Sequence, residues 1–344
     1  MKKTVILNIL KHPLFCHFYL SWMFLYIAFR DRDYIKKKVR DVRTNEGIPI
    51  RCYNVWLAAV FHYWLPKEYF CYKYYIHTKR ERRQFVLNWE KNYLAETLNN
   101  QDDICILNNK LLTYNYFKDF YKRIITFADS SKGDFIPILK ETLRVNSKVI
   151  IKPVTSGNGY GIKLLDGDSL LGGNIHDILP IDNDSIYIIE ELIIQDEQMA
   201  KFHPSSINSV RISVFRTRFG EFVFRSFMRI GTRDSILDNI KGSIVCNIDI
   251  ETGMITSAAI DTGEIITTHP DTKEEIVGFT IPRWSDAIQV VKELMTRMPN
   301  SRYLSWDLAL THKGWDLIEG NPRGQFYGFQ MPEGKGIRDF IEQI

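Results

Sequence analysis

Residues Ser305–Pro322 read SWDLALTHKGWDLIEGNP, and they carry the strongest structural signal in this chain. Apolar residues fill both halves and Gly314 stands between them, which predicts two short strands joined by a turn. With residues 312–314 as the loop, Thr311 faces Trp315 across the hairpin. Every other cross-strand pair then follows by counting back in step.

That register places Asp307 directly opposite Glu319. Side chains alternate along a strand, so Asn321 lies on the same face as Glu319. Facing carboxylates repel each other. A divalent cation between them removes that repulsion, and Asn321 offers a third hard oxygen ligand, which favours magnesium over zinc. The alternative is a solvent-exposed hairpin with unrelated acids.

Composition indicates an ordinary globular protein. The 344 residues are enough for two or three packed units, with 45% hydrophobic and 25% charged residues. A net charge of +4 permits anionic ligands, but no basic stripe interleaved with aromatic residues indicates nucleic acid. The cysteines are odd in number and form no CxxC pair, so we expect neither zinc nor disulfides, and a cytoplasmic location. They are Cys16, Cys52, Cys71, Cys105 and Cys246.

The segment 13–29 is aromatic, carries no formal charge and has basic residues on both sides. Apolar side chains cover nearly every face of the helix it predicts. It is short for a membrane span, and Lys11 interrupts any signal-peptide pattern. Two interpretations stay open: a helix buried in the protein, or peripheral contact with the anionic inner leaflet of a membrane.

The pattern of apolar and polar residues changes after about residue 100. Before it, residues 34–43 and 79–98 predict charged amphipathic helices. After it, short apolar runs alternate with Gly, Asn and Asp, and helical patterns return at 285–297 and near 335–344. We therefore predict an α+β or α/β chain. The predicted strands are 149–154, 186–189, 210–215, 222–227 and 243–250.

Two stretches indicate phosphate and nucleotide binding. Lys152 ends a strand, and residues 154–161 follow with glycines at 157, 159 and 161. Such a loop lets backbone N–H groups approach phosphate oxygens, and the lysine adds a charge, although the pattern is neither Walker A nor GxGxxG. The strand 186–193 runs into two acids and has free backbone groups that suit an adenine. The alternative for the glycine loop is a flexible hairpin tip, and the alternative for the strand is an ordinary strand end at the surface.

In this order, these segments resemble the ATP-grasp superfamily. Residues 206–211 and 306–321 look most like its sugar-transfer-associated group, which is linked to bacterial surface polysaccharide synthesis. The pattern is also similar to the glutathione synthetase and ribosomal-protein glutamate ligase branch. The resemblance covers roughly residues 100–335. It implies an α+β chain with a mainly helical region over 1–100 and an ATP-grasp domain over 101–344, whose two α/β subdomains clasp ATP. The lid subdomain would span about 145–200 and the catalytic subdomain about 205–335.

The resemblance also implies roles for individual residues. Those expected to bind ATP are Lys110 and Lys152 at the phosphates, Ser156, Gly157, Asn158, Gly159 and Gly161 in the lid loop, and Glu190, Glu191, Leu192 and Ile193 in the adenine hinge. Those expected at the phosphoryl-transfer path are Arg211, Arg229, Asn239 and Lys241. Those expected to bind Mg²⁺ are Asp307, Glu319 and Asn321. Ser243 departs from the pattern, which has a second glycine there.

The implied activity is ATP- and Mg²⁺-dependent joining of a carboxylate to an amine through an acyl-phosphate. Both substrates would be small molecules, such as an amino acid and an amino sugar, the latter nucleotide-linked or lipid-linked. Two anions meet in this reaction, so charge neutralisation and alignment carry most of the catalysis. A kinase that phosphorylates a sugar or polyol hydroxyl, and a binding protein without turnover, are the alternatives.

Overall fold

The computed structural model describes residues 13–146, 148–155, 161–167, 185–235, 238 and 242–342, and its chain divides into two compact units. Unit 1 runs to Leu87 and also includes the segment from Glu333 onward; unit 2 is Asn88–Pro332. Unit 1 therefore combines segments that are far apart in sequence, whereas the sequence-based division assigned 101–344 to one domain.

Unit 1 is helical, as the spacing of its aromatic and charged residues predicts. The segment 13–29 forms one helix with Phe24 and Ala28 buried, while Phe18 and Trp22 are exposed. The predicted helix over 79–98 is interrupted at Phe85–Leu87, whose apolar side chains are buried. The helices of unit 1 are α2 (Pro13–Arg30), α3 (Arg32–Asp41), η1 (Val42–Glu46), α4 (Cys52–His62), α5 (Pro66–Cys71), η2 (Tyr74–Ile76), α6 (Lys79–Gln84) and α16 (Arg338–Ile341).

The C-terminal segment is tied into unit 1 by backbone contacts. Arg338 donates from Nε to the Arg83 carbonyl at 2.6 Å and from Nη2 to the Phe85 carbonyl at 2.9 Å. Gly336 lies so close to the backbone of Gln84 that a Cβ would stand 2.0 Å from its carbonyl carbon. Only glycine fits at that position.

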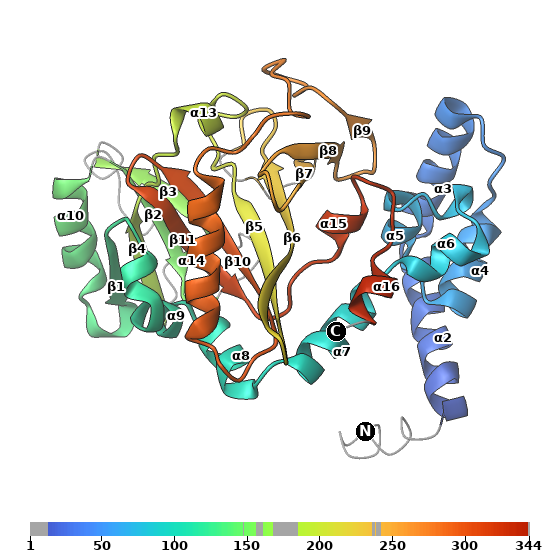
Figure 1. Ribbon diagram of the computed structural model, residues 1–344, viewed down its shortest axis with the longest axis horizontal. Helices are drawn as coiled ribbons and strands as arrows, with labels where there is room; N and C mark the ends of the chain where they lie inside the picture. The colour runs from blue at the N-terminus through green and yellow to red at the C-terminus, as the bar shows by residue number, and fades with distance from the viewer. Residues whose placement is uncertain are drawn as a thin grey trace. The chain divides into compact units, whose positions relative to one another are not determined.

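Unit 2 holds two antiparallel sheets and the remaining helices (Figure 1). Its helices are α7 (Asn88–Leu98), α8 (Gln101–Leu107), α9 (Lys110–Phe117), η3 (Lys118–Phe120), η4 (Ser130–Lys132), α10 (Phe135–Val145), α13 (Glu197–Ala200), α14 (Trp284–Thr296) and α15 (Tyr327–Gln330). Its strands are β1 (Ile125–Asp129), β2 (Lys148–Pro153), β3 (Lys163–Asp166), β4 (Ile186–Glu191), β5 (Val210–Thr217), β6 (Gly220–Ile230), β7 (Ile244–Ile248), β8 (Ile255–Ile260), β9 (Ile265–Ile266), β10 (Tyr303–Thr311) and β11 (Gly314–Asn321).

The larger sheet has the strand order β11-β10-β5-β6-β7-β8-β9. The alternation of residues 210–214 predicts its two faces correctly. Val210, Ile212 and Val214 join the buried core with α14, which lies across this sheet in Figure 1. Arg211 and Ser213 therefore belong to the opposite face, which carries the polar side chains.

The smaller sheet has the order β1-β4-β2-β3 and packs one face against α10 (Figure 1). Val149 and Ile151 of β2 and Ile189 of β4 enter that apolar core. Lys152 and Glu190 are one residue out of step with this set, so they lie on the face away from α10. Both charged side chains are nevertheless buried.

Candidate functional site

The register of the β10–β11 hairpin brings the three predicted metal ligands together. Asp307 pairs with Glu319, and Asn321 pairs with Ser305 on the neighbouring position of the same ribbon. The Asn321 amide donates to Asp307 Oδ2 at 3.3 Å and to Glu319 Oε1 at 3.4 Å. Two carboxylates and one amide thus meet in one small region, with the amide N–H₂ group turned towards the carboxylates.

The predicted loop of this hairpin was wrong, although the acidic pair was right. The turn has two residues, so Thr311 pairs with Gly314 and not with Trp315. A β-bulge next to Leu308 inserts one extra residue into β11. This extra residue cancels the one-residue error in the turn and restores the Asp307–Glu319 pair.

Arg211 lies beside this acidic pair on strand β5. Register pairs it with Asp307, and its Nε and Nη2 each donate to one carboxylate oxygen at 2.5 Å. Glu319 Oε1 is 3.8 Å from Arg211 Nη2. A row of charges therefore crosses three strands: Glu319, Asp307 and Arg211. The bidentate pair fixes the orientation of the arginine.

The two carboxylates of this row differ in acidity. Burial would raise the pKa of Asp307, but the Arg211 charge outweighs it and holds that pKa below its ordinary value. Partial burial and the facing Asp307 carboxylate raise the pKa of Glu319, although 44% of its side chain is exposed. Glu319 is thus the carboxylate that gains most from a nearby cation.

The donor set fits a hard divalent cation. It contains carboxylate and amide oxygens and no sulfur or imidazole. Among the described residues, no group of three or more His, Cys, Asp or Glu side chains could hold a metal ion. The hairpin has two carboxylates, and its third donor is an amide. The repulsion between Asp307 and Glu319 is the observation that supports this fit, and their role as metal ligands stays a prediction.

On the smaller sheet, Glu190 joins two cations in a buried network. Its Oε1 lies 2.5 Å from Lys152 Nζ, and its Oε2 accepts from Arg123 Nε at 3.0 Å and Nη2 at 2.9 Å. Burial opposes ionisation of Glu190, but the two cations lower its pKa to about 2. This side chain is therefore committed to ion pairs, and its backbone lies inside the sheet, paired with Ile125 of β1 and Ile150 of β2. The hinge prediction therefore has to rest on the residues that follow Glu190.

Arg123 connects the two sheets of unit 2, and sequence analysis missed it. Besides Glu190 on β4, it donates from Nη1 to Asp316 Oδ1 at 2.6 Å and to the Leu317 carbonyl at 2.9 Å, both on β11. Burial would lower its pKa, but Glu190 and Asp316 raise it above the ordinary value. A buried arginine clamp thus holds the sheet of Lys152 against the hairpin.

Lys110 lies near the charged row of the hairpin and near the buried network around Glu190. It begins α9 and is half-buried. Burial and the Lys152 charge lower its pKa, while Glu319 and Glu190 act in the opposite direction. Two lysines far apart in sequence therefore share one electrostatic environment with the acidic hairpin.

The predicted adenine-hinge residues continue β4. Glu191 accepts a hydrogen bond from the Ile124 N–H at 3.1 Å and donates its own N–H to the Ile124 carbonyl at 2.9 Å. Leu192 and Ile193 follow the strand and are half-buried. Their contact with a base stays a prediction.

Arg229 lies on β6, buried, and donates from Nη2 to Gln325 Oε1. Burial and the Arg211 charge lower its pKa. Asp238 faces the same region: it accepts from Ser209 N at 3.2 Å and from the Ser209 hydroxyl, and burial raises its pKa. Gln325 and Asp238 carried no motif in the sequence.

Several predicted residues lie outside the described part of the chain. These are Ser156, Gly157, Asn158 and Gly159 of the lid loop and Asn239 and Lys241 of the transfer path. Gly161 is described, with a φ of +75° and the ring of Pro153 at 3.0 Å from where a Cβ would stand. That backbone conformation requires glycine.

A known protein family matches the second half of this chain. The family model for sugar-transfer associated ATP-grasp proteins matches residues 173–344, half of the chain. This protein belongs to the sugar-transfer associated ATP-grasp family and has the ATP-grasp fold. The match includes Arg211, Arg229 and the acidic hairpin but not Lys110 or Lys152. A comparison with curated proteins finds no significant match.

Three solved structures show a similar chain course. The ADP complex of purK, an N5-carboxyaminoimidazole ribonucleotide synthetase, is 14% identical, with a TM-score of 0.42 over 64% of this chain and 46% of that one. The D-alanyl-alanine synthetase A of Vibrio cholerae O1 biovar eltor str. N16961 is 12% identical, with a TM-score of 0.43 over 69% and 63%. The ATP-grasp ligase PsnB, complexed with a minimal precursor, is 12% identical, with a TM-score of 0.42 over 71% and 60%. The chain thus spans less than two thirds of each, and the likeness is too coarse to assign residues.

Proposed function

We propose that this protein is an ATP- and Mg²⁺-dependent carboxylate–amine ligase that works through an acyl-phosphate. The observation that carries the proposal is the meeting of Lys110 and Lys152 with the Glu319–Asp307–Arg211 row. Cations that suit phosphates stand beside oxygens that suit a metal ion. Such an arrangement fits a metal-bound triphosphate.

Each charged residue of the site has a role that follows from the sign of its charge. Lys110 and Lys152 neutralise phosphate oxygens, and Lys152 exchanges its Glu190 partner for them in part. Arg211, held by Asp307, presents a fixed guanidinium to the developing charge on the transferred phosphoryl group. Arg229 does the same from β6. Mg²⁺ bound at Asp307, Glu319 and Asn321 would neutralise phosphate charge during transfer.

For the two molecules that are joined, we propose chemical classes and not particular compounds. The family description points to sugar transfer, which supports an amino sugar in surface polysaccharide synthesis as the amine. The carboxylate would be an amino acid or a similar small acid. A nucleotide-linked or a lipid-linked sugar satisfies the same chemistry.

The test is an ADP-release screen of amino acids against nucleotide-linked amino sugars with Mg²⁺ present. A ligase releases ADP and phosphate only when a carboxylate and an amine are both supplied. ADP release with a hydroxyl substrate alone would support the kinase instead. No turnover with any pair, together with ATP binding, would favour a binding protein.

We also propose that α2 contacts the anionic inner leaflet of a membrane from the cytoplasmic side. None of the helices in the described ranges is both long and apolar enough to cross a bilayer. One stripe of α2 is exposed: Phe18 at 79%, Trp22 at 62%, Tyr26 at 58% and Phe29 at 52%. Exposed basic residues of α3 follow directly in the chain, which supports an interfacial helix.

Co-sedimentation with vesicles tests this contact. The protein should pellet with phosphatidylglycerol vesicles and not with phosphatidylcholine vesicles. Trp22→Glu should reduce pelleting, whereas Thr44→Glu, an exposed position outside the stripe, should reduce it much less. Equal loss in both variants would refute a specific role for the stripe.

A further inference from the structure

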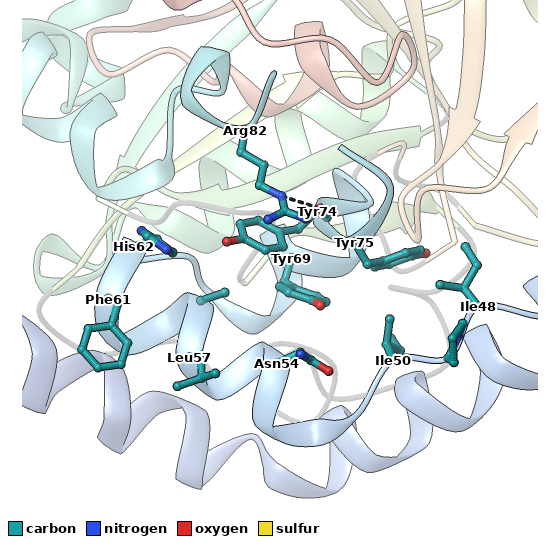
Figure 2. Close-up of a pocket in the computed structure, with 12 residues that line it drawn as sticks. Ile48, Ile50, Asn54, Leu57, Phe61, His62, Tyr69, Tyr74, Tyr75 and Arg82 are labelled. Carbon is teal, nitrogen blue, oxygen red and sulfur yellow. Dashed lines mark hydrogen bonds between the residues drawn. The ribbon is translucent and has the colours of Figure 1, made fainter. Parts of the chain in front are cut away.

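A pocket of about 740 Å³ is built entirely from unit 1 (Figure 2). Residues of α4, of α5 and η2, and of the segment before α4 line it, with Arg82 of α6 at one end. This volume lies in the range of small-molecule sites. None of the residues implicated in ATP chemistry belongs to it.

Aromatic rings form the inner wall. Tyr69 and Tyr74 stack with ring centroids 4.9 Å apart, and Trp64 packs edge-on against Tyr74 at 4.8 Å. Burial raises the pKa of Tyr69 to about 12, so this ring is neutral at physiological pH. The wall is therefore uncharged at Tyr69, mainly aromatic, and supported by packing from behind.

Arg82 supplies the positive end of the pocket. Its guanidinium lies 4.0 Å from the centre of the Tyr74 ring, and its Nε donates to the Tyr74 carbonyl at 2.9 Å. Across the described ranges, no carboxylate forms an ion pair with Arg82, so its terminal nitrogens can serve a ligand. Stacking and the backbone bond hold the guanidinium in place.

Other charges around the pocket are unevenly distributed. Burial and the charges of Arg82, Lys79 and Arg83 lower the pKa of His62, which also lines the pocket, so positive charge acts on this part of it. The acid of the same helix, Glu81, accepts hydrogen bonds from Thr78. Near the other end, the Tyr75 hydroxyl donates to both oxygens of Glu46 at 3.1 Å. An anionic group is therefore favoured at the Arg82 end only.

The rim of the pocket is apolar and open to solvent. Leu57 and Phe61 of α4 line it with 48% and 60% of their surface exposed. They stand four residues apart, so they share one side of the helix. Both side chains lie on the same side of the pocket in Figure 2. Hydrocarbon placed here would remove apolar surface from water.

We propose that this pocket binds an anionic amphiphile, with a phosphate monoester head at Arg82 and an alkyl chain along Leu57 and Phe61. A phosphate presents several oxygens to the arginine fork and to the surrounding cations, which suits its doubly negative charge. The site stands on unit 1 alone and does not depend on the proposed ligase activity.

Calorimetric titration of the full chain with dodecyl phosphate, kept below its micelle concentration, tests the proposal. One saturable site is expected. Dodecyl maltoside, with the same chain and a neutral head, and inorganic phosphate should each bind at least about tenfold more weakly. Equal binding by the neutral amphiphile would remove the role of charge, and equal binding by inorganic phosphate would remove the role of the chain; either result overturns the proposal.

Matched variants locate the site. Arg82→Gln should weaken dodecyl phosphate binding about tenfold, whereas Arg80→Gln, an exposed position on the same helix, should leave it unchanged. Equal weakening by both would mean diffuse attraction and no pocket. Leu57→Gln tests the alkyl contact without touching the Arg82 bonds, and unchanged binding there overturns that contact. Thermal unfolding confirms that each variant is folded.

Discussion

Replacing Arg123 with glutamine should weaken the connection between the two sheets of unit 2. The arginine is buried and makes four hydrogen bonds: two to Glu190, one to Asp316 and one to the Leu317 carbonyl. Glutamine leaves Asp316 without a cation, while Glu190 keeps Lys152. Breaking a buried ion pair from one side costs about 3–5 kcal/mol. Because one of the two acids keeps a partner, we expect a loss of about 3 kcal/mol in the free energy of unfolding.

Urea denaturation at neutral pH measures this loss as a lower midpoint with an unchanged slope. A double-mutant cycle with Asp316→Asn isolates the pair, and the combined variant should be less destabilised than the sum by about 1–3 kcal/mol. Arg123→Lys keeps the charge without the fork and should fall between the wild type and Arg123→Gln. A loss below about 1 kcal/mol, or simple additivity in the cycle, would refute the clamp.

The remaining predictions concern the nucleotide and the metal. Glu319→Gln should abolish Mg²⁺-dependent turnover in a folded protein, and normal activity would count against the metal assignment. Lys152→Ala should weaken ATP binding about ten- to hundredfold by calorimetry, while Lys148→Ala, exposed on the same strand, should not. The pKa of Glu319 is raised, so without metal the unfolding free energy should fall as the pH rises from the ordinary glutamate pKa through the raised one. Thermal melts across pH should show that Mg²⁺ removes this fall and that Glu319→Gln abolishes it.

Local patterns predicted a large part of the fold. The alternation around Arg211 assigned both faces of β5, and residues 285–297 closely match α14. The acidic pair was also predicted, although only because the bulge beside Leu308 compensated a turn that is one residue shorter than expected. Turn length and bulges are set by a few backbone angles, and residue type alone constrains these weakly.

Long-range pairing was beyond the reach of local patterns. Arg123 follows Lys122 just before β1 and belongs to no motif, and its partners Glu190 and Asp316 lie 67 and 193 residues further along the chain. Asp238 likewise accepts a hydrogen bond from Ser209, 29 residues earlier in the chain, which no local pattern indicates. The helix predicted over 79–98 ends early because Phe85–Leu87 gains more from burial than from continuing a helical turn.

The return of Glu333 and its successors to unit 1 has a consequence for biosynthesis. The ribosome synthesises residues 88–332 between the two parts of unit 1. Unit 1 therefore stays incomplete until all of unit 2 has been synthesised. The Arg338 bonds to the Arg83 and Phe85 carbonyls then close it last. A released chain truncated before Gly336 should therefore expose the Gln84–Phe85 backbone to proteases, even where the sheets have already formed.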